Sequence, residues 1–420
     1  MNKKNNWHAG SLRNYPLLLI VFLFSLYACN KDQNGIPEKE FTYLVDYEEL
    51  HTLQKNVIIA TQTAVALQYP EINQLKDSIK YNVDVYRVLY RTSIMSEQIV
   101  ASGLVCIPSG KGIFPILSFQ NGTNTAHANA PTENAGSNTF MLLQGLAGTG
   151  YIMLIPDYAG FGASDSLIHP YFIKDPTSRS VIDFIRASRE FIDYYIEEVA
   201  YTLECYLAGY SQGGWASLVV LQALEQDKIA DIEVKAVSCG AGAYNLKSMT
   251  EYVISQETYP GSYYLPYFLY THQQYGLITE PMQKYFLEPY ASLIPSLFDG
   301  SFSNQEVRDQ LTDTIRNLLT PSFVNTFPSG AEYEEIREDM ISNSIFAWQT
   351  NTMLRFYHGT NDEDIPPEQS MDIYQDFLSS GSTGTVEHFE IAGAGHSTGI
   401  LPWGISTLIW FNELRASYSK

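Results

Sequence analysis

The hydrophobic positions of the chain follow two different periods. Residues 81–90 and 98–108 alternate apolar and polar side chains, which is typical of an antiparallel strand pair with one face in water. Further along, apolar residues form short continuous runs, most of them followed by a turn and a helical stretch. Such runs are typical of parallel strands that are buried on both faces; they are FPILSF, YIMLIP, CYLAGY, KAVSCGAG, MLRFYHG and VEHFEIAG. The pattern predicts an α/β protein with a mostly parallel, eight-stranded sheet.

Apolar residues at helical spacing predict the helices that cover this sheet. Residues 47–68 have this spacing and predict an N-terminal helix that packs onto the main body. The other predicted helices lie at 138–147, 177–198, 212–226, 367–380 and 400–414.

A long segment between Ala243 and Met353, about a hundred residues, contains no clear parallel strand. A segment of this length is too long for a loop and is typical of a functional insertion. We therefore expect a helical cap at 245–350, between a first part of the core (47–244) and a second part (351–420). The cap is rich in tyrosine, whose rings combine apolar area with a polar tip, so these rings either line a substrate pocket or pack the cap against itself.

The first residues have the pattern of an exported lipoprotein. Basic residues precede an apolar run, Leu17–Leu26, which is followed by Tyr-Ala-Cys. The run is about half as long as a membrane-spanning helix, but Leu-Tyr-Ala-Cys resembles a bacterial lipobox, in which the cysteine is diacylated after cleavage. We therefore expect a signal peptide at 1–28, lipidation of Cys29 and a tether at 29–46, which places the protein in the cell envelope, at the outer membrane. The alternative is an ordinary signal peptide or an interfacial helix, in which Cys29 has no special role.

Composition and charge narrow the class of protein. Hydrophobic residues make up 45% of the chain and charged residues 17%, which predicts a packed globular protein. The formal net charge of −21 argues against nucleic acid as a partner, because no counterion release would offset the repulsion between two polyanions. Cys106, Cys205 and Cys239 lie in apolar runs, so we expect buried free thiols rather than a disulfide framework.

The strongest chemical signal is the motif GYSQG at 209–213, which follows the apolar run CYLA and precedes the helical pattern WASLVVLQAL. A strand, a sharp turn and a helix around Gly-x-Ser-x-Gly predict a nucleophile elbow, whose glycines permit the crowded backbone that exposes the serine hydroxyl. The N-terminus of the following helix can stabilise an oxyanion. We therefore expect Ser211 to be a nucleophile; a turn needed only for tight packing is the structural alternative.

A serine hydroxyl needs a base that accepts its proton, so a histidine has to reach Ser211. His396 follows the last apolar run in a glycine-rich loop, past the end of a strand. His358 is the main rival, but it precedes a glycine at a strand end and is expected to support its loop by hydrogen bonding. His127 is a candidate for lining the pocket. We expect His396 to be the base.

The base in turn needs a carboxylate that fixes its tautomer and stabilises its charged form. The loop at 359–366 offers Asp362, Glu363 and Asp364. Asp362 lies closest to the strand end, whereas Asp364 is expected to bind loop backbone or to face water. We therefore expect Asp362 to orient His396. The sequence contains no HExxH, CxxC or phosphate-binding glycine loop, so it implies neither a metal nor an organic cofactor.

The order Ser211, Asp362, His396 is that of the α/β-hydrolase superfamily, which residues 81–414 resemble. The motifs GYSQGG, HGTNDEDIP and GAGH carry the resemblance, and PDYAGFGAS resembles the DxxGxG turn after the fourth strand of many such enzymes. The long cap and the SQGG elbow are most similar to the secretory lipase and carboxylesterase branch. The resemblance implies an α/β-hydrolase fold with helices on both faces of the sheet and the cap between strands six and seven.

The segment SFQNGT at 118–123 is similar to the His-Gly-X oxyanion turn of bacterial and fungal lipases and esterases, with Asn121 in place of the histidine. The resemblance implies that the backbone N–H groups of Thr123 and Gln212 bind the oxyanion. Because these donors are backbone groups, Asn121 changes only the outer support of the hole. The implied reaction is hydrolysis of a small-molecule or lipid ester through an acyl-enzyme.

Three other functions remain compatible with the sequence. A prolyl oligopeptidase-like serine peptidase uses the same triad, but such chains usually carry a large propeller domain, for which 420 residues leave no room. An acetyl or feruloyl esterase of polysaccharides is a substrate subclass that sugar binding by the tyrosine-rich cap would favour. The third is a surface lipoprotein that binds a ligand without turning it over, against which the intact triad argues.

Overall fold

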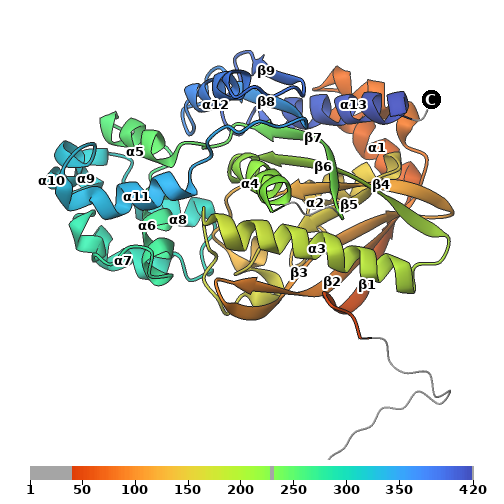
Figure 1. The fold of residues 1–420 in the computed structure, drawn as a ribbon, viewed down its shortest axis with the longest axis horizontal. Helices are drawn as coiled ribbons and strands as arrows, with labels where there is room; N and C mark the ends of the chain where they lie inside the picture. The colour runs from red at the N-terminus through yellow and green to blue at the C-terminus, as the bar shows by residue number, and fades with distance from the viewer. Residues whose placement is uncertain (1–39, 228–230, 419–420) are drawn as a thin grey trace, which may run out of the picture. The chain divides into compact units, whose positions relative to one another are not determined.

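A twisted β-sheet lies at the centre of the fold (Figure 1). The computed structural model describes residues 40–227 and 231–418. The strand order is β1-β2-β3-β5-β4-β6-β7-β8-β9. Pairs among β1, β2, β3 and β5 are antiparallel, and all pairs from β5 and β4 to β9 are parallel. The strands are β1 (Leu44–Leu53), β2 (Val83–Ile94), β3 (Glu97–Pro108), β4 (Gly112–Gln120), β5 (Ile152–Pro156), β6 (Val199–Tyr210), β7 (Glu233–Gly240), β8 (Met353–Gly359) and β9 (Val386–Ile391).

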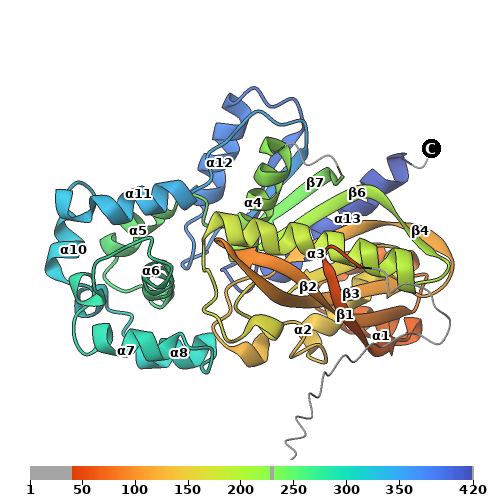
Figure 2. The same ribbon diagram turned by 60° about the horizontal axis from the view of Figure 1, so that its bottom comes forward.

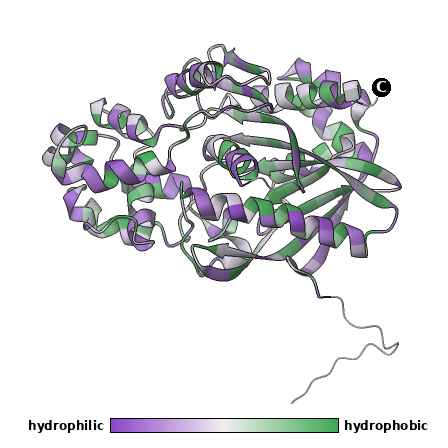
Figure 3. Cartoon of the chain, in the orientation of Figure 1, coloured by the Kyte–Doolittle hydropathy of each residue, from purple (hydrophilic) through white to green (hydrophobic). Residues whose placement is uncertain are grey.

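Helices cover both faces of this sheet (Figures 1 and 2). One face carries α3 (Lys174–Tyr195), α4 (Gln212–Gln226) and α12 (Glu368–Ser379), and the other carries α1 (Lys55–Val65), α2 (Asn138–Gly145) and α13 (Ile400–Tyr418). Figure 3 shows hydrophobic residues along the central strands, as burial on both faces requires. The predicted fold class and the predicted covering helices are therefore confirmed.

The N-terminal end of the sheet differs from the prediction of eight strands and of a helix over 47–68. The first part of this segment is a ninth strand, β1, and α1 begins only at Lys55. β1 is an edge strand whose side chains are mostly exposed, so it lacks the alternation that identifies a strand. The carboxylate of Glu190 accepts hydrogen bonds from the three backbone N–H groups of 42–44. Pairing with β2 and this anchor, which are tertiary contacts, therefore outweigh the local helical spacing.

The segment between β7 and β8 forms a helical cap, which lies at one end of the sheet (Figures 1 and 2). These two strands are the sixth and seventh of the predicted sheet, because the additional strand β1 shifts the numbering by one. Cap and sheet belong to the same compact unit, Phe41–Lys420. The cap helices are α5 (Leu246–Ser255), α6 (Tyr264–Gln274), α7 (Tyr290–Leu297), α8 (Asn304–Gln310), α9 (Ile315–Leu318), α10 (Pro321–Thr326) and α11 (Glu334–Asn343).

A buried histidine of the cap joins the cap to the core. His272 of α6 is fully buried, and its Nδ1 lies 2.6 Å from the carboxylate of Asp339 in α11. Its Nε2 lies 2.9 Å from the carbonyl oxygen of Tyr171, in the loop before α3. Both ring nitrogens of His272 thus lie within hydrogen-bonding distance of an oxygen atom, one in the cap and one in the core. The indole of Trp215 in α4 adds a second tie by donating to the carbonyl oxygen of Asn343.

The cysteines and the N-terminal segment are two further points of comparison with the sequence. Cys106, Cys205 and Cys239 are buried free thiols, as predicted. No helix in 40–227 or 231–418 is both long and apolar enough to span a bilayer. Residues 1–28 and Cys29, the predicted signal peptide and lipidation site, lie outside the described residues, as does most of the predicted tether.

Candidate active site

Ser211 lies on a sharp turn between β6 and α4. Its backbone has φ +59° and ψ −123°, a conformation that side-chain-bearing residues rarely adopt. The turn closes because its glycines have no side chain: a Cβ on Gly209 would lie 2.1 Å from the carbonyl oxygen of Gly213, and one on Gly213 would lie 2.0 Å from that of Gln120. The backbone N–H of Ser211 donates to the carbonyl oxygen of Gly240 on β7. These contacts fix the hydroxyl at the carboxyl end of the parallel strands.

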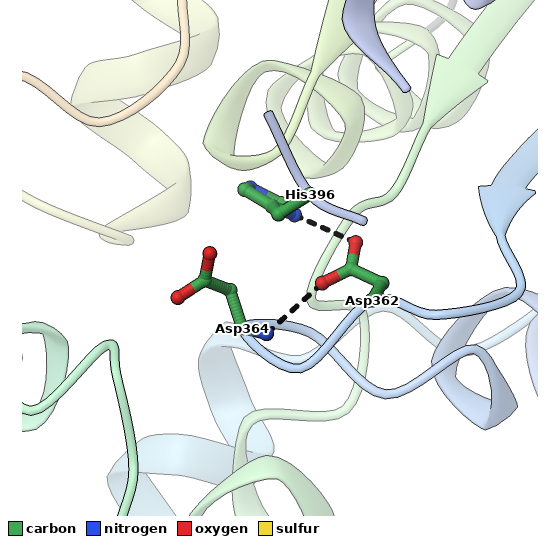
Figure 4. Close-up of side chains that lie close together, drawn as sticks. All are labelled: Asp362, Asp364 and His396. Carbon is green, nitrogen blue, oxygen red and sulfur yellow. Dashed lines mark hydrogen bonds and ion pairs between the residues drawn. The ribbon is translucent and has the colours of Figure 1, made fainter. Parts of the chain in front are cut away.

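The structure brings Ser211, His396 and Asp362 together in one chain of hydrogen bonds. The Ser211 hydroxyl lies 2.9 Å from Nε2 of His396. Nδ1 of the same ring lies 2.7 Å from the Asp362 carboxylate (Figure 4). Because the carboxylate only accepts, Nδ1 carries the proton and Nε2 is free to accept the proton of the serine hydroxyl. This is the arrangement that general-base activation of a serine needs.

The Asp362 carboxylate is buried yet stays ionised. Burial raises its pKa, but hydrogen bonds from His358 and His396 outweigh this effect and lower the pKa to about 2. The other carboxylate oxygen accepts from the backbone N–H groups of Asp364 and Ile365. Asp362 therefore holds a fixed negative charge beside the ring of His396 at neutral pH.

Asp364 lies close to the hydrogen-bonded group of Asp362 and His396. Its side chain is half-buried in the site, and its carboxylate lies within 4.8 Å of ligand atoms of both Asp362 and His396 (Figure 4). Burial raises the pKa of Asp364. Among the described residues its buried oxygen makes no hydrogen bond to the loop backbone, and the side chain lines a cavity that also contains Ser211 and His396.

The other histidines have structural surroundings. His358 is fully buried, with Nδ1 2.6 Å from the hydroxyl of Ser370 and Nε2 2.9 Å from the carbonyl oxygen of Ile365. It supports the loop of Asp362, as expected. His127 lies in a separate cavity beside Gly300 of the cap and not beside Ser211.

Thr123 and Gln212, the two expected oxyanion donors, line one pocket together with Ser211. Neither of their backbone N–H groups donates to another group among the described residues, and the N–H at the start of a helix has no intrahelical partner. Asn121, where a histidine stands in the resembling motif, donates from its side chain to the carbonyl oxygen of Pro156 at 2.7 Å. The outer support of this loop is thus an amide bonded to the end of β5.

Three residues that sequence patterns do not reveal hold these two donors in place. His169 accepts a hydrogen bond from the side chain of Gln212 at 2.9 Å, and burial lowers the pKa of His169 to about 4, which keeps it neutral and able to accept. The Tyr171 and Thr123 hydroxyls lie 2.8 Å apart. Asn304 of the cap donates to the carbonyl oxygen of Thr123. No motif spacing marks these residues, because their role depends on tertiary contacts.

Among the described residues, Asp362, Asp364 and His396 are also the group whose ligand atoms lie close enough together to hold a metal ion. Both ring nitrogens of His396 already have partners, in Asp362 and Ser211. A metal ion would have to displace one of these two hydrogen bonds. The arrangement therefore suits proton transfer better than metal binding.

Two cavities of different character meet at Ser211. The first, called here the narrow pocket, has a volume of about 60 Å³ and is lined by Thr123, Gln212 and mostly apolar residues of the cap such as Leu246, Met249, Val253 and Phe268. The second, called here the wide chamber, has a volume of about 590 Å³ and is lined by His396, Asp364 and residues of the cap that include Arg308, Asn304 and Tyr263. Several of the cap tyrosines, Tyr259, Tyr263 and Tyr264 among them, thus line these cavities.

Residues 125–266 match the secretory lipase family. The structure of Legionella pneumophila protein lpg1103 is similar to this one, with a TM-score of 0.79 and 24% identity over 88% of this chain and 98% of that chain. The rice cell wall degrading esterase LipA of Xanthomonas oryzae has a TM-score of 0.75 and 22% identity, over 88% and 97%. For Candida antarctica lipase A the values are 0.59 and 14%, over 84% and 77%. No curated protein matches the sequence.

The sheet order, the elbow and the helical cap are those of the α/β-hydrolase fold, and the structural neighbours share this fold. The chain thus has the α/β-hydrolase fold, and about a third of it, residues 125–266, is similar to secretory lipases.

Replacement of Asp362 by asparagine tests the chain of hydrogen bonds. We expect Asp362→Asn to lower kcat for an activated ester by about 10³-fold to 10⁴-fold, because an amide that donates to Nδ1 imposes the wrong tautomer on His396. Steady-state kinetics with p-nitrophenyl butanoate measure this, with Glu363→Gln as the control in the same loop. A loss of less than tenfold would show that Asp362 does not orient His396.

The lowered pKa of Asp362 also has a consequence for stability. Ionised Asp362 stabilises the fold by about 2 kcal/mol above its ordinary pKa of 3.8, and this contribution is lost as the pH falls toward 2. In urea unfolding between pH 5 and pH 2, the free energy of unfolding should therefore fall less steeply for Asp362→Asn than for the wild type.

Proposed function

We propose that this protein is a serine esterase that cleaves carboxylic esters through an acyl-enzyme. The observation that carries the proposal is the chain of hydrogen bonds from Ser211 through His396 to Asp362, with the serine on a strained elbow. The two N–H groups without partners, of Thr123 and Gln212, supply the donors that a tetrahedral intermediate requires.

The chemistry follows from the positions of these groups. His396 Nε2 takes the proton of Ser211 as Oγ bonds to the ester carbonyl carbon, and the N–H groups of Thr123 and Gln212 stabilise the oxyanion. As the C–O bond to the alcohol breaks, His396 returns the proton to the departing oxygen. A water molecule then attacks the acyl carbon while His396 Nε2 takes its proton. His396 returns this proton to Ser211 Oγ as the bond between Oγ and the acyl carbon breaks, which frees the acid and regenerates the Ser211 hydroxyl. Asp362 stabilises the imidazolium in both steps.

The position of His396 decides which cavity holds which part of the ester. The departing alcohol has to receive its proton from Nε2, and His396 borders the wide chamber but not the narrow pocket. The alcohol therefore occupies the wide chamber. The acyl group then extends into the narrow pocket, whose apolar side chains suit a hydrocarbon chain.

The size of the narrow pocket favours short acyl chains. Its volume of about 60 Å³ is small beside the wide chamber's volume of about 590 Å³. We expect kcat/KM to be highest near butanoate and hexanoate and to fall steeply toward palmitate. Met249→Ala, which removes a side chain from the wall of this pocket, should raise the ratio of octanoate to butanoate turnover several-fold. Met95→Ala, far from the pocket, is the control, and an unchanged ratio in Met249→Ala would contradict this assignment of the acyl site.

The proposed function is tested by replacing the nucleophile. We expect Ser211→Ala to lower the turnover of p-nitrophenyl butanoate by at least about 10⁴-fold, since no other hydroxyl occupies its position on the elbow. Purified protein that lacks residues 1–29 should be assayed with and without this substitution, and labelled with a fluorophosphonate. Equal hydrolysis by both proteins would overturn the proposal, whereas labelling of Ser211 without any ester hydrolysis would favour a peptidase.

We further propose that lipidation of Cys29 anchors the enzyme in the cell envelope, at the outer membrane. The support is the Leu-Tyr-Ala-Cys sequence at the end of the short apolar run. Two or more acyl chains bind a membrane durably, whereas one does not. Cys29→Ala should move the protein from the membrane fraction to the soluble fraction, as judged by fractionation and by metabolic labelling with a fatty acid. Unchanged membrane association would count against the lipid anchor.

A further inference from the structure

The wide chamber contains two charged residues for which ester cleavage itself has no use. Asp364 reaches the chamber from the loop after β8, and Arg308 reaches it from α8 of the cap. Within the described residues, the Asp364 oxygen Oδ1 and the Arg308 nitrogen Nε are both buried and have no hydrogen-bond partner. The two side chains do not form an ion pair with each other, nor does Arg308 with any other described carboxylate.

Buried polar atoms without partners are costly, which is why most of them in folded proteins are hydrogen-bonded. One atom of this pair accepts hydrogen bonds and the other donates them, and both belong to residues that line one cavity together with Ser211 and His396. A bound group that both donates and accepts would satisfy the two atoms at once. The pair is therefore arranged for a ligand rather than for the fold.

The charges restrict the chemistry of that ligand. A cationic alcohol would be attracted by Asp364 but repelled by Arg308. An anionic alcohol would be attracted by Arg308 but repelled by Asp364. A simple alkyl alcohol would leave both polar atoms unsatisfied. A neutral group with several hydroxyls satisfies both, because each hydroxyl donates and accepts. The ring of Tyr263, over which the Arg308 guanidinium lies at 5.8 Å, adds apolar area beside these polar groups.

We propose that Asp364 and Arg308 determine specificity by binding the alcohol portion of the ester, a neutral polyhydroxylated group such as a sugar ring. The inference rests on the proposed function, because the wide chamber is assigned to the alcohol by the position of His396. The substrate class is thus a short-chain acyl ester of a sugar hydroxyl. Asp364 accepts from one hydroxyl and Arg308 donates to a neighbouring one, which orients the ester oxygen toward Nε2 of His396.

Paired substrates with one acyl group test this proposal. The specificity ratio is kcat/KM for methyl 6-O-butanoyl-glucopyranoside divided by kcat/KM for ethyl butanoate. We expect Asp364→Asn and Arg308→Met each to lower this ratio about tenfold. The matched controls are Glu363→Gln, in the same loop, and Arg316→Met, in the same cap, both of which are exposed and should leave the ratio within twofold of the wild type. Equal losses on both esters would overturn the proposal, because Asp364 would then act only through the electrostatics of His396.

Binding separates this inference from the proposed function. In the Ser211→Ala background, calorimetry should show that the same butanoyl glucoside binds, and that Asp364→Asn and Arg308→Met weaken the binding about tenfold. If the wild type hydrolyses no ester, the proposed function fails while this measurement still decides the inference. Absence of binding, or binding that neither substitution weakens, would overturn it. Thermal unfolding of each variant establishes that it is folded, and either variant alone suffices if the other does not fold.

Discussion

The backbone turn at Ser211 is the constraint on which the rest of the site depends. A positive φ at a serine costs on the order of 1–3 kcal/mol, and the turn closes only because Gly209 and Gly213 leave room for carbonyl oxygens about 2 Å from where a Cβ would be. The buried strand β6 and the buried first turns of α4 hold this conformation from both sides. The turn then places the hydroxyl, the N–H of Gln212 and the helix N-terminus on one side of the sheet edge.

The second donor, Thr123, depends on the cap as well as on the sheet. Asn304 of α8 binds its carbonyl oxygen, and the Tyr171 hydroxyl contacts its side chain. The Tyr171 carbonyl oxygen is in turn held by His272, whose other ring nitrogen lies 2.6 Å from the carboxylate of Asp339. The cap is thus part of the support of the oxyanion donors and not only a cover over the site. A conformational change that moved α6 or α8 would also change the position of Thr123.

The sequence was sufficient where burial and chain order determine the structure. The parallel strands could be predicted from their continuous apolar runs, and β2 and β3 from alternating apolar and polar positions. Ser211, His396 and Asp362 follow the ends of parallel strands, which bring them together at one edge of the sheet. β1 was missed because an edge strand is held by pairing and by Glu190 rather than by its own pattern. His169 and Arg308 could not be found, since their roles depend on which side chains the cap turns inward. No local sequence pattern indicates which side chains of the cap point toward the site.

The loop after β8 shows how two carboxylates of one type acquire different roles two residues apart. Asp362 receives hydrogen bonds from His358 and His396, which lower its pKa and leave it ionised and fully occupied. Asp364 receives no hydrogen bond on its buried oxygen, so burial raises its pKa and one acceptor remains unused. A carboxylate whose acceptors are all occupied can orient His396 but cannot bind a ligand. A carboxylate with an unused acceptor beside the reacting atoms can bind a ligand. This difference explains why Asp362 orients the base while Asp364 is the residue that we propose to select the substrate.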